Sequence, residues 1–454
     1  MDVVVLETPP LGDRSYLVHD GSVAFVVDPQ RDHDRMEAAA RDAGVRITHV
    51  AETHLHNDYL TGGLALARAV GAEYLVSADD EVEYERTGVR DGDVLAVGDL
   101  EVLVVATPGH THNHLSYVVR HDGREAVFSG GSLLYGSVGR TDLIAPADTE
   151  PLTRHQYRSA RRLTEVAGEG AQLYPTHGFG SFCSSGPASG AQSSTLGEQR
   201  RTNHALTDDD EDHFVRELIA GLTAYPSYYA HMGPQNRRGP GSPDLSVPEP
   251  LDGAELARRL EAGEWVVDLR NRVAFASEHL KGSVSFEYGD GSSFTTFLGW
   301  TLPYGDRITL VGSREDVEKA VRDLSRIGID GPDAALGERP ADLAPGAPTD
   351  TIPRVGWAEV AEALKAGGET VLDVRREDEY ATSHVEGAVN LPLHDLLTRH
   401  RELPEGRLWV HCASGYRSGV AASLLRRLGR DVVQVDAEYD QAGFAGVPVA
   451  AGNS

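Results

Sequence analysis

Short apolar runs rich in β-branched residues alternate with helical patterns over roughly the first 230 residues of the chain. Runs of this length and composition are typical of strands, and longer stretches with apolar positions three and four residues apart are typical of helices. The pattern therefore predicts layers of sheet and helix. The predicted strands span residues 3–6, 15–18, 23–27, 47–50, 99–106, 115–120 and 126–128, and the predicted helices span residues 36–43, 64–70 and 153–167.

Two later stretches break this pattern. Residues 232–250 and 331–353 are dense in Gly and Pro, and such composition does not favour a helix interior or a central strand. We interpret residues 233–250 and 331–351 as linkers. They divide the chain into three predicted domains at residues 1–232, 251–330 and 352–454.

The second and third predicted domains are related by an internal repeat. Asp, Arg, His and Gly recur at a constant offset of 105 residues, as Asp268, Arg270, His279 and Gly282 and then as Asp373, Arg375, His384 and Gly387. Each copy continues with an apolar strand, at residues 308–311 or 408–411, and then a helix. This order predicts βα units of a mainly parallel sheet in two successive, related domains.

Composition narrows the class of protein. With 40% hydrophobic residues the chain can bury real cores, and its length of 454 residues suits about three domains. Two cysteines, Cys183 and Cys412, cannot form a disulfide framework, so we expect a reducing, cytoplasmic location. The net charge of −28 argues against nucleic acid or an anionic membrane as a partner, and no apolar run reaches the length of about 18 residues that spans a bilayer.

Histidines lie at the ends of three separate predicted strands in the first domain. His54 and His56 follow one strand and are joined by Asp58, His110 follows a second within Thr-Pro-Gly-His, and His177 lies in Pro-Thr-His-Gly. Imidazole and carboxylate are the ligands that zinc and iron(II) favour. Each motif alone is weak, but their combination predicts a metal site at one edge of a sheet.

The segments THLHND, TPGHT, FSGG..L...VGRTDL and YPTHG, in this order, resemble the metallo-β-lactamase superfamily, in the branch that holds glyoxalase II and the persulfide dioxygenases. This resemblance implies a four-layer αββα sandwich. It also implies first-metal ligands His54, His56 and His110 and second-metal ligands Asp58 and His177. In the dioxygenases one iron is held by two histidines, which correspond to His54 and His110, and by an aspartate, which falls in the stretch that here reads Phe-Ser-Gly-Gly-Ser-Leu at residues 128–133.

The chain departs from this family pattern at two positions. Tyr59 stands where the family has His, and Gly131 stands where it has the Asp that bridges two metals or completes the iron site. A site of His54, His56 and His110 still suits one Fe(II) or Zn(II) with an open position. Asp58 either replaces the lost carboxylate or orients a histidine from behind.

Other polar residues of this domain have competing interpretations. Arg140, in Gly-Arg-Thr-Asp, is either a fixed cation that binds a small anionic substrate or half of a structural pair with Asp142. Tyr59 is a second substrate-binding candidate, although packing is the commoner role of such a tyrosine. We expect Cys183 to be a structural thiol. His112 and His114 flank His110 without a motif of their own, and we expect ordinary solvated loop histidines there.

Cys412 begins a short loop between an apolar strand and a helix predicted at residues 419–428. Backbone N–H groups of such a loop and the helix N-terminus stabilise a thiolate, and Arg417 adds a positive charge. We therefore predict Cys412 to be an activated nucleophile.

The third domain resembles the rhodanese superfamily through LDVRREDEYATSHVEGAVNLP and CASGYRS. The resemblance implies sulfur transfer through a Cys412 persulfide, with Arg417 assisting, a loop of Ala413, Ser414, Gly415 and Tyr416, and support from Asp373 and Arg375. Phosphatases of the same fold have a loop one residue longer. The second domain, the cysteine-free repeat, has Val311-Gly312-Ser313 at the loop position and Asp316 roughly where Arg417 stands, which predicts a scaffold or docking role.

Three functions fit these observations. The first is an enzyme that oxidises a low-molecular-weight thiol persulfide to sulfite at a single metal and exchanges sulfur with thiosulfate or sulfite through Cys412. The second replaces the oxidation by zinc-dependent hydrolysis of a thioester, as in glyoxalase II. The third is a persulfide carrier whose metal domain is inactive. The oligomeric state stays open, with a homo-oligomer among the alternatives.

Overall fold

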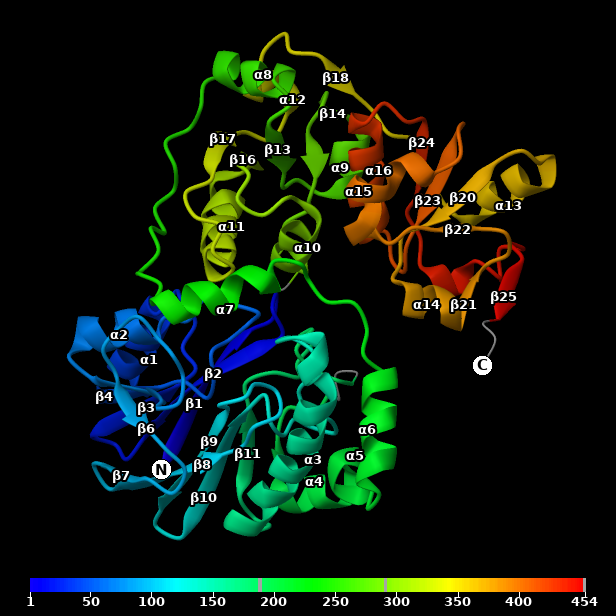
Figure 1. The fold of residues 1–454 in the computed structure, drawn as a ribbon. Coiled ribbons are helices and arrows are strands. Elements are labelled where there is room, and N and C mark those ends of the chain that lie inside the picture. Colours follow the sequence, from blue (N-terminus) through cyan, green and yellow to red (C-terminus); the bar gives the residue numbers. More distant parts are fainter. Residues whose placement is uncertain (187–189, 290–291, 452–454) are drawn as a thin grey trace. The chain divides into compact units, whose positions relative to one another are not determined.

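The computed structural model describes residues 1–186, 190–289 and 292–451. The chain folds into two compact units (Figure 1). The first unit comprises Met1–Asp244 together with Leu324–Gly328, and the second comprises Leu245–Asp323 and Ile329–Ser454.

Two six-stranded sheets form the centre of the first unit. One has the order β1 (Asp2–Thr8), β2 (Asp13–His19), β3 (Val23–Val27), β4 (Arg46–Ala51), β5 (Glu73–Ser77), β6 (Thr87–Val89). The other has the order β12 (Ser194–Thr195), β11 (Gln172–Pro175), β10 (Arg124–Gly130), β9 (Leu115–His121), β8 (Leu100–Ala106), β7 (Val94–Val97). The strands β3 to β6 run parallel, which places the loops that follow β3 and β4 at the same sheet edge.

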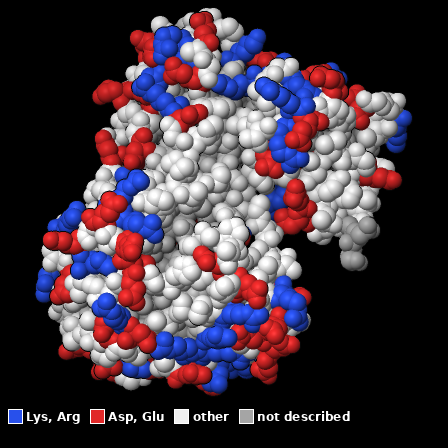
Figure 2. All heavy atoms as spheres, in the orientation of Figure 1, with Lys and Arg blue, Asp and Glu red and all other residues white. Residues whose placement is uncertain are grey.

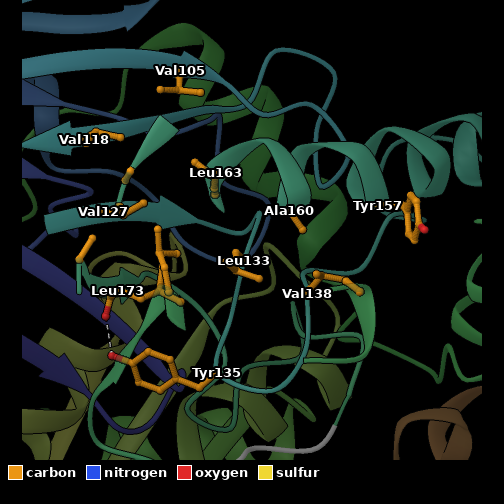
Figure 3. Close-up of a cluster of buried hydrophobic side chains, with 14 of the residues drawn as sticks. Val105, Val118, Val127, Leu133, Tyr135, Val138, Tyr157, Ala160, Leu163 and Leu173 are labelled. Atoms are coloured by element: carbon orange, nitrogen blue, oxygen red, sulfur yellow. Dashed lines mark hydrogen bonds between the residues drawn. The ribbon is translucent and has the colours of Figure 1, made fainter. Parts of the chain in front are cut away.

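Helices cover the outer faces of both sheets, and three buried clusters separate the layers. A cluster that includes Phe25 and Tyr117 lies between the sheets. A second, with Val26 and Met36, joins the first sheet to α1 (Asp34–Ala43) and α2 (Gly63–Val70). The third joins the second sheet to α3 (Thr149–Val166), α4 (Leu196–Thr202), α5 (His204–Thr207) and α6 (Glu211–Ala220), as Figure 3 shows for Val127 and Leu163 among others. The predicted αββα sandwich is therefore confirmed.

The second unit contains two mainly parallel sheets that repeat one plan. The first copy has the order β15 (Val284–Ser285), β13 (Trp265–Asp268), β16 (Ile308–Gly312), β17 (Asp333–Leu336). The second has the order β22 (Val389–Asn390), β20 (Thr370–Asp373), β23 (Leu408–His411), β24 (Val432–Val435), followed by an edge strand β19 (Arg354–Val355). Each copy adds a two-stranded ribbon, β14 (His279–Leu280) with β18 (Thr349–Asp350), and β21 (Ser383–Val385) with β25 (Val449–Ala451). The predicted internal repeat thus appears as equivalent strand orders.

Helices surround both sheets of this unit. The cysteine-free repeat carries α8 (Gly253–Glu261), α9 (Arg272–Ser277), α10 (Phe294–Thr301), α11 (Arg314–Arg326) and α12 (Pro340–Leu343). The repeat that holds Cys412, called the cysteine repeat below, carries α13 (Trp357–Ala366), α14 (Glu377–Thr382), α15 (Leu396–Arg399) and α16 (Tyr416–Arg427).

Neither predicted linker is a simple connection. Residues 229–238 form α7 (Tyr229–Arg238) despite Pro234, because Tyr229, Met232 and Asn236 recur at helical spacing and are buried. The stretch 331–351 contains β17, α12 and β18, so it belongs to the cysteine-free repeat, which extends to about residue 350. Gly and Pro composition was misleading here because tertiary packing overrides local propensity.

No helix of the described residues is both long and apolar enough to cross a membrane. Where charged side chains gather in Figure 2, acidic and basic ones lie beside one another, so the excess negative charge does not form one patch on the viewed face.

Candidate metal site and cysteine loop

The histidines singled out in the first unit meet at one sheet edge. His54 and His56 follow β4, His110 follows β8 and His177 follows β11, and all four side chains are buried. The ring centroids of His54 and His110 are 4.8 Å apart, and those of His110 and His177 are 5.3 Å apart. Three distant strand ends therefore deliver their imidazoles to one place, as the sequence predicted.

One group of three histidines has the donor set for a metal ion. The ligand atoms of His54, His110 and His177 lie within 4.8 Å of one another. His110 Nδ1 donates to the carbonyl of Arg140 at 2.7 Å, which leaves the buried Nε2 without a partner. His54 Nδ1 contacts Thr53 Oγ1 at 2.9 Å, and its Nε2 faces His177 Nε2 at 3.4 Å. The Nε2 atoms of these rings are thus the ones left over for a metal.

The carboxylates around His56 are functional neighbours that the sequence did not reveal. His56 Nε2 lies 3.3 Å from Asp28 Oδ1, 3.3 Å from Glu52 Oε2 and 3.0 Å from the hydroxyl of Tyr59. Burial opposes protonation of His56, but Asp28 and Glu52 outweigh it and raise its pKa to about 9. Asp28 and Glu52 each follow a strand directly, the same signal that identified the histidines.

His177 has a similar carboxylate pair behind it. Its Nδ1 lies 2.9 Å from Asp13 Oδ1 and 3.2 Å from Asp58 Oδ2. Burial lowers the pKa of His177, and the charges of Asp58 and Asp13 reverse this and raise it well above its ordinary value. Such carboxylates orient an imidazole and increase its basicity toward a metal. Asp58 therefore serves either as this partner or as a ligand in the second group, His56, Asp58 and His177.

The residues present fit a divalent metal ion. His110 Nε2 and His56 Nδ1 are buried without a hydrogen-bond partner within the described part of the chain, a costly state for a polar atom. Burial lowers the pKa of His54 well below its ordinary value and that of His110 to about 3, so both rings are neutral and free to coordinate. The buried carboxylates Asp28 and Asp58 supply negative charge that a cation would balance, because neighbouring histidines outweigh the effect of burial and lower the pKa of both.

Gly131 leaves no room for the carboxylate that the family has at this position. A Cβ atom on Gly131 would overlap His110 Cδ2, so an aspartate would displace the His110 ring. The backbone N–H of Gly131 instead donates to His114 Nε2 at 3.0 Å, and His114 Nδ1 contacts Thr107 Oγ1 at 2.9 Å. The expectation of a solvated His114 was therefore wrong, because both its nitrogens are used in a buried network, whereas His112 is exposed.

The other residues of this unit that the sequence singled out are buried, namely Arg140, Tyr59 and Cys183. Arg140 pairs with both carboxylate oxygens of Asp142, at 2.7 and 2.8 Å, and also donates to two backbone carbonyls, which is the structural alternative considered above. Tyr59 stacks on His56 with ring centroids 4.3 Å apart. The thiol of Cys183 is fully buried, and burial followed by the charge of Asp58 raises its pKa well above its ordinary value. The Arg140 side chain is thus engaged with Asp142 and Tyr59 with His56, and substrate binding by either residue stays a prediction.

The loop that follows β23 begins at Cys412. The backbone N–H of Gly415 donates to Cys412 Sγ at 3.2 Å. Gly415 has φ of +98°, and a Cβ atom there would overlap the carboxylate of Asp436, so the turn requires glycine. Ala413 is half-buried, Ser414 is exposed, and Tyr416 and Arg417 begin α16. An inward N–H at a helix N-terminus stabilises sulfur in its anionic form.

The supporting pair beneath this loop is an ion pair in both repeats. Asp373 and Arg375 are buried and meet at 2.6 Å, while Asp268 and Arg270 meet at 2.7 Å. In the cysteine-free repeat, however, Ser313 Oγ donates to Asp316 Oδ2 at 2.7 Å and accepts the N–H of Asp316, an ordinary helix cap.

Two family models match the chain. Residues 9–177 match the metallo-beta-lactamase superfamily, and residues 357–441 match the rhodanese-like domain. The chain therefore contains a metallo-beta-lactamase superfamily domain followed by a rhodanese-like domain.

Relatives of the first domain include two kinds of enzyme. A hydroxyacylglutathione hydrolase of Rhizobium johnstonii is 33% identical over 144 residues, which are 31% of this chain and 54% of the hydrolase. The mitochondrial persulfide dioxygenase ETHE1 of Homo sapiens is 27% identical over 213 residues, which are 45% of this chain and 73% of the dioxygenase. This chain thus spans about half the length of the hydrolase that it matches.

A solved structure extends the similarity past the first domain. The metallo-beta-lactamase of Staphylococcus aureus has a TM-score of 0.67 and 28% identity, with 74% of this chain and 99% of that chain covered.

Proposed function

We propose that this protein is a sulfur-metabolism enzyme in which Cys412 transfers sulfane sulfur and the metal site of the first unit acts on a low-molecular-weight thiol persulfide. The observation that carries the proposal is the Gly415 N–H directed at Cys412 Sγ, at 3.2 Å, in a chain that also gathers His54, His110 and His177.

Sulfur transfer at Cys412 follows from this loop. The Cys412 thiolate attacks the outer sulfur of thiosulfate, the S–S bond of thiosulfate breaks, and its electron pair leaves with sulfite. The N–H of Gly415 donates to Cys412 Sγ in the resting enzyme. The persulfide then gives its terminal sulfur to an acceptor thiolate or to sulfite.

The first unit contributes residues that hold and orient the metal site. Arg140 O fixes the ring of His110, Thr53 contacts His54, and Asp13 fixes His177, so that each histidine keeps one nitrogen for coordination. A bound Fe(II) would supply the redox chemistry by which persulfide, O₂ and water give thiol, sulfite and a proton. The relation to the human persulfide dioxygenase supports this version.

A second candidate is zinc-dependent hydrolysis of a glutathione-type thioester. Two overlapping donor groups share His177, namely His54–His110–His177 and His56–Asp58–His177, which suits a pair of ions. The relation to hydroxyacylglutathione hydrolases supports this alternative.

Metal analysis of chelator-free protein, combined with oxygen uptake on glutathione persulfide, separates the candidates. Stoichiometric iron with uptake that His110→Ala abolishes supports the dioxygenase. His112→Ala is the matched control, because His112 is exposed nearby and we expect it to retain metal and uptake. Zinc with thioester turnover and no uptake supports the hydrolase. Protein that binds neither metal and retains only Cys412-dependent thiosulfate:cyanide activity contradicts both and leaves a persulfide carrier.

A further inference from the structure

The charge of Arg417 is already engaged inside the protein. Arg417 lies in the first turn of α16, and its guanidinium meets Glu379 of α14 through two parallel hydrogen bonds of 2.6 and 2.8 Å. A cation at a helix N-terminus opposes the helix dipole, so it needs an anion beside it. The bidentate pair supplies that anion in a fixed orientation.

Glu379 is itself held in place. Its carboxylate accepts the backbone N–H of Arg376 at 3.1 Å and so caps α14, while the side chain of Arg376 lies 3.7 Å away. Burial raises the pKa of Glu379, but the hydrogen bonds and charge of Arg417 outweigh it and lower the pKa. The carboxylate is therefore ionised at neutral pH.

The other charged groups around the Cys412 loop are also paired. Asp373 meets Arg375 at 2.6 Å and lies 3.5 Å from His411. Burial lowers the pKa of His411, so that ring is neutral at neutral pH.

On the side formed by β24, Asp436 meets Arg272 of the cysteine-free repeat at 2.9 Å and Arg354 at 3.3 Å. The ring centroid of Phe297, in the same repeat, lies 5.9 Å from the Arg417 guanidinium. Nearby, burial is the largest cause of the lowered pKa of His394. The balance between Arg417 and Glu379 thus sets the charge at the start of α16.

We propose that Glu379 is a positioning residue that neutralises Arg417, so that the Cys412 loop favours a thiol persulfide, whose reacting sulfur group carries one charge, over thiosulfate, in which both charges lie on the reacting group. The inference rests on the sulfur transfer proposed above. A dianion gains less in a loop where the Arg417 charge is already neutralised by Glu379, because no free cation offsets the desolvation of the second charge. In the favoured reaction Cys412 thiolate bonds to the outer sulfur of the persulfide, and the thiol leaves as thiolate with the electron pair.

Glu379→Gln tests this inference, because glutamine keeps the shape of the side chain and removes its charge. We expect the KM for thiosulfate to fall about threefold or more relative to the KM for glutathione persulfide. Arg417→Gln should change this ratio in the opposite direction. The double variant should return to within about twofold of the wild-type ratio, since both charges of the pair are then removed together. Glu379→Asp keeps the negative charge, so it should retain the wild-type ratio of the two KM values. An unchanged ratio in Glu379→Gln, or a change that persists in the double variant, overturns the proposal.

Alkylation of Cys412 by iodoacetamide as a function of pH gives a readout that needs no sulfurtransferase activity. In a Cys183→Ala background, Glu379→Gln should shift the midpoint of the alkylation rate downward by about half a pH unit, and Arg417→Gln should shift it upward. Coincident profiles in all variants overturn the proposal. A protein that lacks sulfur transfer but shows these shifts contradicts the proposed function and leaves the charge assignment intact. Tryptophan fluorescence verifies folding, because all four tryptophans lie in the second unit.

Discussion

The two repeats of the second unit share a scaffold and differ in one loop. In both, the Asp of the repeated motif accepts the N–H of the Arg two residues later, at 3.0 Å for Asp268 and at 2.9 Å for Asp373. In both, the repeated His donates from Nδ1 to the carbonyl four residues earlier, from His279 at 2.9 Å and from His384 at 3.0 Å. The residues by which the repeat was recognised are therefore those that build the fold.

The difference lies where the strand meets the helix. Cys412 is followed by a turn that needs Gly415 at positive φ and directs an N–H at sulfur. In the cysteine-free repeat Gly312 is not among the residues with positive φ, and Ser313 simply caps α11. The repeated motif thus indicates a common scaffold, whereas the loop between strand and helix indicates whether a repeat has a reactive group.

Replacing Cys412 should have the largest effect. Cys412→Ser should lower thiosulfate:cyanide turnover by about 10³-fold or more, because the nucleophile is lost and the cysteine-free repeat has no thiol. Cys183→Ala, in the first unit, should keep this turnover. Residual sulfur transfer in Cys412→Ser would show that the comparison between the repeats misplaces the chemistry.

Breaking the shared ion pair should unfold either repeat with similar ease. Asp373→Asn should lower the free energy of unfolding by about 3–5 kcal/mol, because it leaves the Arg375 charge buried and unpaired, and Asp268→Asn should cost nearly as much. Urea unfolding followed by tryptophan fluorescence measures both. The exposed pair Arg407–Asp431 provides the control, with an expected loss below about 1 kcal/mol for Asp431→Asn. A large cost in one repeat only would contradict a common scaffold.

Replacing Gly415 in the cysteine loop should be more destabilising than replacing Gly312 in the cysteine-free repeat. Gly415→Ala should cost about 1–3 kcal/mol and reduce turnover, because it strains positive φ and collides with Asp436. In Gly312→Ala the new Cβ meets Leu269 Cβ at 3.2 Å, and we expect a smaller loss. Equal losses would remove the distinction between the two turns.

The repeated histidines should give the smallest and most equal effects. His384 stacks on Tyr380 and His279 on Phe275, each with ring centroids 4.0 Å apart. His384→Ala and His279→Ala should each cost about 1–2 kcal/mol through one hydrogen bond and one stacking contact. Turnover measured on the folded fraction should change little in either variant. A specific loss of sulfur transfer in His384→Ala would assign that histidine a role that its partner lacks.

Part of the metal site could be predicted from the sequence alone. Strand-end motifs predicted that His54, His56, His110 and His177 would meet, since strand ends share an edge of a sheet. The predicted ligand set contained His56, whereas the donor atoms gathered in one group of three histidines are those of His54, His110 and His177, because His56 Nε2 faces two carboxylates. Asp28 and Glu52 follow strands as the histidines do, but neither they nor Asp13 belong to a recognisable motif, so the carboxylates behind the histidines were missed. His114 was misjudged for the same reason, since its burial depends on Gly131 and Thr107 from other strands.

Composition was the weakest guide. Glycine and proline around residue 234 predicted a linker, yet α7 forms there and the Asn236 amide donates to the carbonyls of His56 and Tyr59, both at 2.8 Å. The burial of one face of α7 stabilises the helix by more than the glycine and proline residues destabilise it.

The sequence by itself determined the layered fold, the repeat and the meeting of the histidines, and it predicts Cys412 as the nucleophile. These features depend on local periodicity and on motifs a few residues long. Only the tertiary structure decided which nitrogen of each histidine stays free, that Arg140 is paired with Asp142, and that Glu379 holds Arg417. Those outcomes depend on distances of about 3 Å between groups that are not adjacent in the backbone, a range within which hydrogen bonds and charge pairs form or fail.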